Sequence, residues 1–150
     1  MAAAFTGRPS KAPASPALCP TLDDLETELK QLEVMAELDA GHPVDVVRTF
    51  LGAHAVPPEY AGRSGDYVDF VSDTVLPAVV ERNLAHCCDV FCEENVFSVE
   101  QSRRLLRRAK ALGLKVKLHA DEIVSLGGAE LAAQLVAVSA DHLVAISKKG

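Results

Sequence analysis

The sequence predicts an α/β protein in which short, buried, parallel strands alternate with helices. Apolar runs of about four to eight residues, typical of strands buried on both faces, alternate with stretches whose apolar residues recur every three or four positions, as in amphipathic helices. Three of the strand-like runs lead to a histidine, at His54, His119 and His142. Because parallel folds present their chemistry where the strands end, these histidines indicate a polar pocket at one rim of a sheet or barrel.

The order of the elements leaves two architectures open. We expect strands over residues 44–51, 87–92 and 114–118 and within 139–146, and helices over residues 22–38, 66–83, 98–113 and 127–136. Ser98 to Gln101 matches a capping box, and Pro77 should bend or break the second helix. An open doubly wound sheet and part of a (β/α)8 barrel both satisfy this alternation. No glycine-rich nucleotide-binding motif follows any strand.

The first 20 residues differ from the rest of the chain. They are rich in Ala, Pro and Ser and have no apolar periodicity, so we expect residues 1–20 to be a disordered leader and residues 21–150 to form the folded unit. A transit peptide is the alternative, because Arg8 and Lys11 occur in this leader without any acidic residue.

Composition narrows the class of protein. The chain has 150 residues, 49% of them hydrophobic, no Trp and a formal net charge of −6. The acidic balance argues against nucleic-acid binding, and no apolar run is long enough to span a membrane. With no secretory signal either, we expect a cytoplasmic protein. The four cysteines lack the spacing of a zinc site and should be small buried residues: Cys19, Cys87, Cys88 and Cys92.

His119 is the strongest candidate for a metal ligand. It follows an aliphatic run, and Asp121 and Glu122 come directly after it. A neutral imidazole suits zinc or iron, and a nearby carboxylate can move protons to and from a water molecule on the metal. A hydrogen-bonded structural histidine is the alternative for any one of the three. Asp141 precedes His142, but neighbours on a strand point to opposite faces, so the two should not pair.

Six short segments, in this order, resemble imidazolonepropionase, a family of metal-dependent amidohydrolases that fold as (β/α)8 barrels. The resemblance covers roughly residues 21–147, at natural spacing. The segments are Phe50-Leu51-Gly52-Ala53-His54, Pro57-Pro58-Glu59-Tyr60, Asp89-Val90-Phe91-Cys92-Glu93, Leu118-His119-Ala120-Asp121-Glu122, Leu126-Gly127-Gly128-Ala129-Glu130-Leu131 and Ser139-Ala140-Asp141-His142-Leu143.

The resemblance implies a reaction and a role for each matched residue. The family hydrolyses 4-imidazolone-5-propanoate to N-formimidoyl-L-glutamate in histidine degradation, using a metal-activated water. His119 would be a ligand of zinc or iron, and Glu122 would contact the substrate ring and assist proton transfer. His142 would position or polarise the attacking water, and His54 would help to bind the substrate. The partner implied is this small molecule, with a homodimer possible in the full-length family.

The sequence also departs from the family pattern. It contains no His-x-His pair, which the family uses as metal ligands on its first strand, and it ends soon after His142, before the family's last-strand Asp. A complete barrel needs about 250 residues, so this chain should form about four strand–helix units of one. Two alternatives follow, a non-catalytic truncated amidohydrolase and a related ring amidohydrolase or deaminase. We expect an incomplete ligand set and negligible activity from the chain alone.

Overall fold

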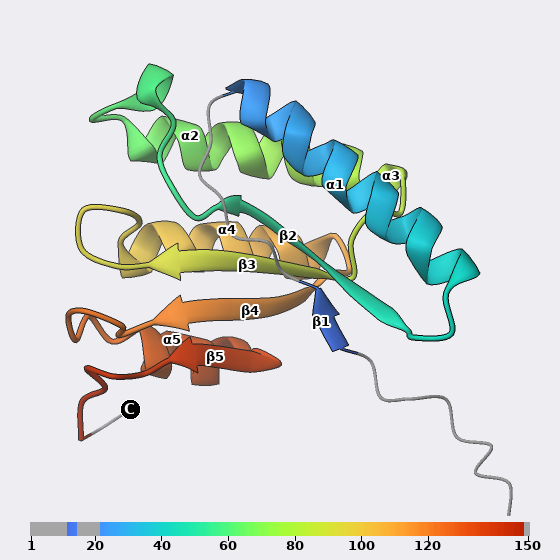
Figure 1. The fold of residues 1–150 in the computed structure, drawn as a ribbon. Coiled ribbons are helices and arrows are strands. Elements are labelled where there is room, and N and C mark those ends of the chain that lie inside the picture. The colour runs from blue at the N-terminus through green and yellow to red at the C-terminus, as the bar shows by residue number, and fades with distance from the viewer. Residues whose placement is uncertain (1–11, 15–21, 149–150) are drawn as a thin grey trace, which may run out of the picture.

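The protein folds as one parallel sheet with helices on its outer side (Figure 1). The structure is a computed structural model that describes residues 12–14 and 22–148. Its strands follow one another in sequence order across the sheet, and every neighbouring pair is parallel. The strands are β1 (Ala12–Ala14), β2 (Val46–Ala53), β3 (Cys87–Cys92), β4 (Lys115–Ala120) and β5 (Ser139–His142).

The helices connect these strands, as the sequence pattern predicts. They are α1 (Leu22–Gly41), the 3-10 turn η1 (Pro58–Tyr60), α2 (Ser64–Phe70), the π-helical turn η2 (Val71–Val75), α3 (Leu76–Glu81), α4 (Val99–Ala111) and α5 (Gly128–Leu135). The helix expected over residues 66–83 is therefore three consecutive segments. Pro77 lies inside this continuous helical backbone and cannot donate a backbone hydrogen bond, and the π-helical turn, in which the Leu76 amide donates to the Val71 carbonyl, directly precedes it.

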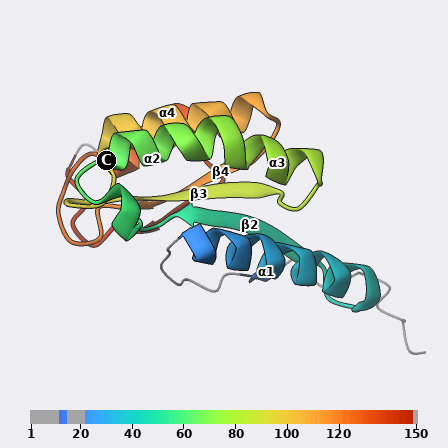
Figure 2. The same cartoon turned by 90° about the horizontal axis from the view of Figure 1, so that it is seen from above.

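The arrangement of the helices decides between the two architectures. Helices α2 to α5 lie side by side along one face of the sheet, and α1 packs along β2 (Figures 1 and 2). A doubly wound sheet has helices on both faces and a strand order that reverses, whereas a (β/α)8 barrel keeps sequential order with all helices outside. The fold is therefore part of a (β/α)8-type barrel, and the face turned away from the helices corresponds to the interior of such a barrel.

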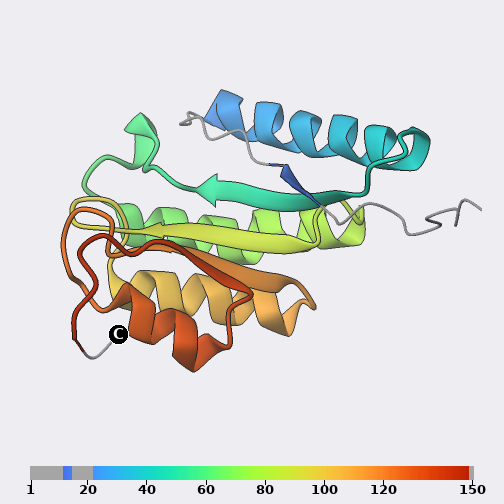
Figure 3. The same ribbon diagram turned by 60° about the horizontal axis from the view of Figure 1, so that its bottom comes forward.

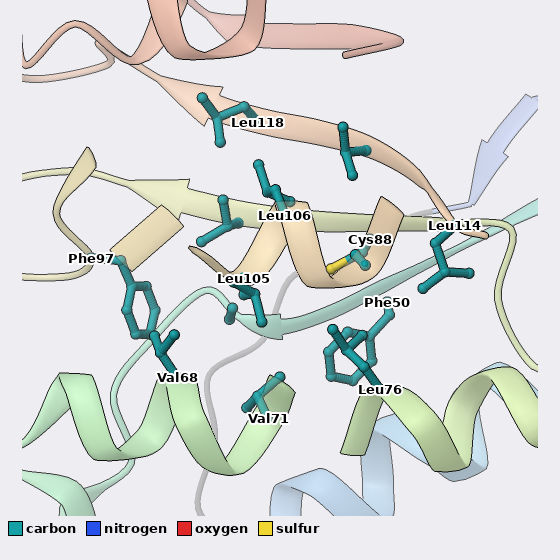
Figure 4. Packing of buried hydrophobic residues seen from close by; sticks show 14 of the residues in the cluster. Phe50, Val68, Val71, Leu76, Cys88, Phe97, Leu105, Leu106, Leu114 and Leu118 are labelled. Atoms are coloured by element: carbon teal, nitrogen blue, oxygen red, sulfur yellow. The ribbon is translucent and has the colours of Figure 1, made fainter. Parts of the chain in front are cut away.

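The hydrophobic core lies between the sheet and its helices. Cys88, Val90 and Leu118 of the strands are fully buried there. Figure 4 shows Cys88 and Leu118 pointing into this core. Leu105 and Leu106 of α4 pack against them from the other layer. Full burial of a Val or Leu side chain contributes about 1.5–3 kcal/mol, so the helix-facing half of each strand contributes substantially to the stability of the fold. The opposite half is free to carry polar groups.

Most boundaries agree with those expected, and two details differ. The capping box is confirmed, since Ser98 Oγ accepts from the Gln101 amide at 3.3 Å and Gln101 Oε1 accepts from the Ser98 amide at 2.9 Å. Strand β4 continues to Ala120, so His119 lies within the strand rather than after it. Within the leader, Ala12–Ala14 pairs with β2 as a strand, and the rest of residues 1–20, Cys19 included, lies outside the described residues.

A bulge in β2 brings His54 to the inner face of the sheet. Phe50 pairs with Cys88, but Ala53 pairs with Val90, so β2 gains one residue relative to β3 between these pairs. Side chains alternate along a strand, and one extra residue therefore reverses the face of everything after it. Without the bulge, His54 would point into the hydrophobic core; with it, the imidazole turns toward the open face.

Three contacts hold this bulge in place. The Phe50 ring lies against Gly52 so closely that a Cβ built there would meet ring carbons at 2.3 and 2.9 Å. The Tyr67 hydroxyl donates to the Gly52 carbonyl at 2.5 Å, and the Leu51 amide donates to Glu28 Oε1 at 2.6 Å. The backbone groups that the bulge removes from the sheet are thus paired with side chains of α2 and α1.

Two further findings concern the described part of the chain. Cys87, Cys88 and Cys92 are buried and free, as expected from their spacing. Among the helices of this part, none combines the length and the apolar character that crossing a membrane requires.

Replacing Tyr67 with Phe should weaken the bulge. Tyr67 is 1% exposed, and the substitution leaves the buried Gly52 carbonyl without this donor, so we expect the free energy of unfolding to fall by about 1–3 kcal/mol. Chemical denaturation measures the loss. Tyr60→Phe, which removes the hydroxyl from the neighbouring ring that lies tilted against Tyr67, is the control and should change stability by less than about 0.5 kcal/mol. Equal effects of the two variants would contradict the role given to the Tyr67 hydroxyl.

Candidate functional site

The three predicted histidines lie together at the carboxyl ends of the strands. His54 directly follows β2, His119 is the penultimate residue of β4, and His142 ends β5. The rings of His54 and His119 have centroids 4.6 Å apart, and those of His119 and His142 are 5.2 Å apart. The loops that follow β2 to β5 gather at this same end (Figure 3). The structure thus brings the three strand ends into one site.

Glu122 extends this row of side chains. Its Oε2 lies 3.4 Å from His142 Nε2, and both side chains are partly exposed. Asp141, the residue before His142, instead faces Lys117 at 3.7 Å. As expected, Asp141 and His142 have different partners, but they do not lie on opposite faces, because Asp141 is the register partner of His119 and so lies on the same side of the sheet as the site. His54, His119, His142 and Glu122 thus form one continuous group at the strand ends.

Asp89 of β3 lies beneath this group, although no role was expected for it. Its side chain is 1% exposed, and Oδ1 lies 3.1 Å from His119 Nδ1 and 3.6 Å from His54 Nε2. Phe91, two residues further along β3, stacks on His54 and meets His119 edge-on, with centroids 6.2 and 6.3 Å away. A single buried carboxylate therefore faces two imidazoles, and an aromatic ring closes one side.

Electrostatics at this carboxylate follow from its partners. Burial raises the pKa of Asp89, but the hydrogen bond with His119, the nearby ring nitrogen of His54 and the positive charge of both imidazoles outweigh burial and lower the pKa to about 2. The hydrogen bond that His119 donates to Asp89 in turn raises the pKa of His119, although partial burial of the ring opposes this. Both pKa shifts have the same cause, the contact between Asp89 and His119, which keeps the buried carboxylate ionised.

Two other carboxylates fix the loop that carries Glu122. Asp121 is fully buried and accepts from four backbone amides at the start of α5, those of Leu126, Gly127, Gly128 and Ala129, at 2.8–3.2 Å. Glu93, at the end of β3, accepts from the Ile123 amide at 2.9 Å. Of the two acids that follow His119 in the sequence, only Glu122 faces the site, because Asp121 caps a helix.

The backbone around the site adopts unusual conformations. Asp121, His142 and Leu143 have φ values of 48°, 72° and 59°, in the left-handed region that non-glycine residues rarely adopt. Such residues cost about 1–3 kcal/mol each and cluster at functional sites, where the surrounding structure enforces them. Asp121 directly precedes Glu122, and His142 is itself one of the candidate site residues. The strain supports a functional interpretation of this end of the sheet.

His54, Asp89 and His119 could hold a metal ion. Each offers one ligand atom, and the three atoms lie within 4.8 Å of one another. Asp89 Oδ2 and His54 Nε2 are buried and have no hydrogen-bond partner among the described residues. Two imidazoles and a carboxylate are ligands that zinc and non-haem iron accept, so the residues present fit such an ion.

A cavity of about 640 Å³ opens near the same strand ends. It lies between the loops after β2, β3 and β4, and Val56, Glu93, Gln101 and Leu126 are among the residues that line it. The histidines do not belong to this lining, so we define the candidate site by its side-chain contacts and not by this cavity.

Sequence reasoning found four of these residues and missed two. His54, His119, Glu122 and His142 follow from strand ends, whereas Asp89 lies within a run expected to be a buried apolar strand. An ionisable residue between Cys88 and Val90 was the signal available, because an unpaired buried charge is costly and indicates a partner. Glu93 gave no such signal, since its partners are backbone amides of a distant loop.

Fold and site together define part of a (β/α)8-type barrel in which polar side chains from successive parallel strands meet at one end and include a group that could hold a metal ion. Comparison with known proteins then gives a particular relative. Over 127 residues, 85% of its length, the chain is 61% identical to the imidazolonepropionase of Clostridium tetani and 62% identical to that of Parabacteroides distasonis. The imidazolonepropionase of Bacteroides thetaiotaomicron is 60% identical over 129 residues. No family model matches the chain.

The chain corresponds to only part of each of these relatives. The chain spans about 30% of the length of these relatives, and the matched part makes up most of the chain. The similarity is therefore that of a fragment of an imidazolonepropionase. It agrees with the family named from the short segments and with the partial barrel.

Glu93→Gln should loosen the loop that carries Glu122. Burial raises the pKa of Glu93, but hydrogen bonds from the amides of Ile123, Glu94 and Val124 together outweigh it, so the pKa lies below its ordinary value of 4.5. The carboxylate therefore stabilises the fold fully above about pH 4.5, and this contribution is lost as the pH falls through its lower folded-state pKa. At pH 7 we expect the variant to lose about 1–3 kcal/mol, because backbone donors lose a charged acceptor.

Hydrogen exchange of the Ile123 amide and denaturation at pH 7 and pH 3 measure this effect. Exchange should speed up in Glu93→Gln, and the stability difference from the unaltered chain should shrink at pH 3. Glu94→Gln, which alters the exposed neighbouring acid, is the control and should leave Ile123 protected. Unchanged protection in Glu93→Gln would show that Glu93 does not hold the loop.

Proposed function

We propose that this chain carries part of the active site of an imidazolonepropionase, which hydrolyses 4-imidazolone-5-propanoate to N-formimidoyl-L-glutamate. The observation that carries the proposal is the convergence of His54, His119, Glu122 and His142 at the ends of three parallel strands. Each of the four lies in a segment that resembles the family, and the relatives with 60–62% identity bear that name. Zinc or iron is the proposed ion, and the proposed location is the cytoplasm.

Each residue has a distinct part in the proposed reaction. When bound, a zinc or iron ion supplies a Lewis acid that lowers the pKa of water toward 7 and so provides a nucleophile at neutral pH. His119 holds this ion in the whole enzyme. His142 orients the attacking water, and Glu122, 3.4 Å from His142, contacts the imidazolone ring and carries a proton to the ring nitrogen that leaves. His54 binds the substrate beside His119.

The remaining partners follow from the reaction. The substrate is a small anionic molecule, and a homodimer of the whole enzyme remains a prediction. A related ring amidohydrolase or deaminase is the second candidate, since barrel enzymes share strand-end sites and differ in the loops that contact the ring. The two candidates differ in substrate, so a test of turnover separates them.

A chimera tests the proposed function directly. The matched segment of the Clostridium tetani enzyme is replaced with residues of this chain, and hydrolysis of imidazolone propanoate is followed. We expect turnover, and we expect Glu122→Gln in the chimera to lower kcat about 10²–10⁴-fold, the usual size of a general acid–base contribution. Glu81→Gln, at the exposed end of α3, is the control and should leave kcat unchanged.

The outcomes of the chimera are distinct. A folded, metal-loaded chimera that does not hydrolyse imidazolone propanoate would contradict the proposal. Preference for a purine or guanine ring would favour the deaminase instead.

The 150-residue chain alone should show no measurable turnover. It contains one of the metal ligands that the family resemblance assigns, His119, and no His-x-His pair. Activity of the purified chain on imidazolone propanoate, measured with added zinc or iron, checks this. Turnover above that of a His119→Ala control would overturn the expectation.

A further inference from the structure

We propose that the 150-residue chain has a metal site of its own, in which His54, Asp89 and His119 together bind one divalent transition-metal ion. This ligand set differs from the one proposed above for the whole enzyme, where His119 holds the ion and His54 contacts the substrate. It includes Asp89, to which the family resemblance gives no role. The proposal rests on the geometry of three side chains and stands apart from the reaction.

The spacing of the three side chains suits a metal ion. Asp89 Oδ1 lies 3.1 Å from His119 Nδ1 and 3.6 Å from His54 Nε2, and all three ligand atoms fall within 4.8 Å of one another. Bonds of about 2.0–2.2 Å at tetrahedral angles place two ligand atoms roughly 3.4 Å apart. The distance from Asp89 to His119 is slightly shorter than this spacing, and the distance from Asp89 to His54 is slightly longer. An ion can therefore enter with small movements of the side chains.

Unpaired polar atoms give independent support. Asp89 is 1% exposed and its Oδ2 has no hydrogen-bond partner, and the buried His54 Nε2 also lacks one among the described residues. Buried polar atoms without partners are rare, because each costs the free energy of its lost hydration. An ion bound to His54 Nε2 and to the Asp89 carboxylate would provide the missing partner for the imidazole and neutralise the buried charge.

The sheet holds the ligands in place before any ion binds. Three adjacent strands, β2, β3 and β4, each contribute one ligand, and their register is fixed by backbone pairing. The bulge in β2 turns His54 to the inner face, and Phe91 packs against both imidazoles. The side chains of His54 and His119 remain 14% and 23% exposed, which leaves a route from solvent.

The chemistry of the ligands selects the ion. Two imidazoles and one carboxylate suit zinc, cobalt or ferrous iron, whereas magnesium and calcium require mostly oxygen ligands. Three protein ligands leave a fourth position for water, as in catalytic zinc sites. The site is therefore expected to take Zn²⁺ and Co²⁺ and to ignore Mg²⁺.

Cobalt titration of the metal-free chain tests the proposal. We expect one Co²⁺ per chain, with the intense visible absorption of a four-coordinate site, and displacement by Zn²⁺ but not by a large excess of Mg²⁺. Asp89→Asn should weaken Co²⁺ binding by at least about 100-fold, since even residues that only orient a ligand contribute 10–100-fold. Asp69→Asn is the control, because it removes an exposed carboxylate of α2 that pairs with Arg104 away from the histidines, and it should change affinity less than about threefold.

Two further variants keep the test decisive. Asp89→Asn can unfold the chain, which circular dichroism will show; His54→Gln, at a partly exposed strand end, then decides, and it should also abolish tight binding. His142→Ala should bind Co²⁺ as the unaltered chain does. The proposal is overturned when the unaltered chain binds no Co²⁺, when folded His54→Gln binds normally, or when His142→Ala loses the ion. Turnover by the chimera enters none of these results, so the two proposals fail independently.

Discussion

The register of the parallel sheet is the constraint on which the site depends. Each strand places alternate residues in the helix-covered core and the others on the open face, and one residue of slippage would exchange the two sets. The bulge in β2 uses this rule: the extra residue between the pairs Phe50–Cys88 and Ala53–Val90 moves His54 from the core side to the open face. Gly52 allows it, because the Phe50 ring occupies the space of a side chain there.

Asp89 shows how the open face tolerates a buried charge. An unpaired carboxylate this deep would be neutralised or would destabilise the fold. Two imidazoles from neighbouring strands instead keep Asp89 ionised and are themselves oriented by it. The same contact therefore serves structure and chemistry, because it offsets the cost of burial and brings two potential ligands to one oxygen. Asp121 and Glu93 use another solution, in which backbone amides supply the partners.

The sequence predicted the architecture better than the site. Strands such as β3 and helices such as α4 follow from apolar periodicity and a capping box, which are local signals. The sequence also predicted that His54 and His119 lie close together, because the carboxyl ends of parallel strands meet at one edge of the sheet. The bulge could not be predicted, because the contacts that hold it form only in the folded chain. The Tyr67 hydroxyl reaches the Gly52 carbonyl from another element, and the Phe50 ring folds back over Gly52. Asp121 was expected beside His119, yet a left-handed backbone turns it toward α5.

Separation of the two faces explains how a partial barrel can keep an ordered site. The buried core of the described residues lies between the sheet and its helices, and it is made by residues such as Val90, Leu106 and Leu118, which do not touch the open face. Packing there fixes the strands and hence the direction of every side chain on the inner face. His54, Asp89 and His119 come from three neighbouring strands whose mutual pairing needs no further strand. The geometry of this group is thus determined within the segment, whereas closing the barrel determines what else surrounds it.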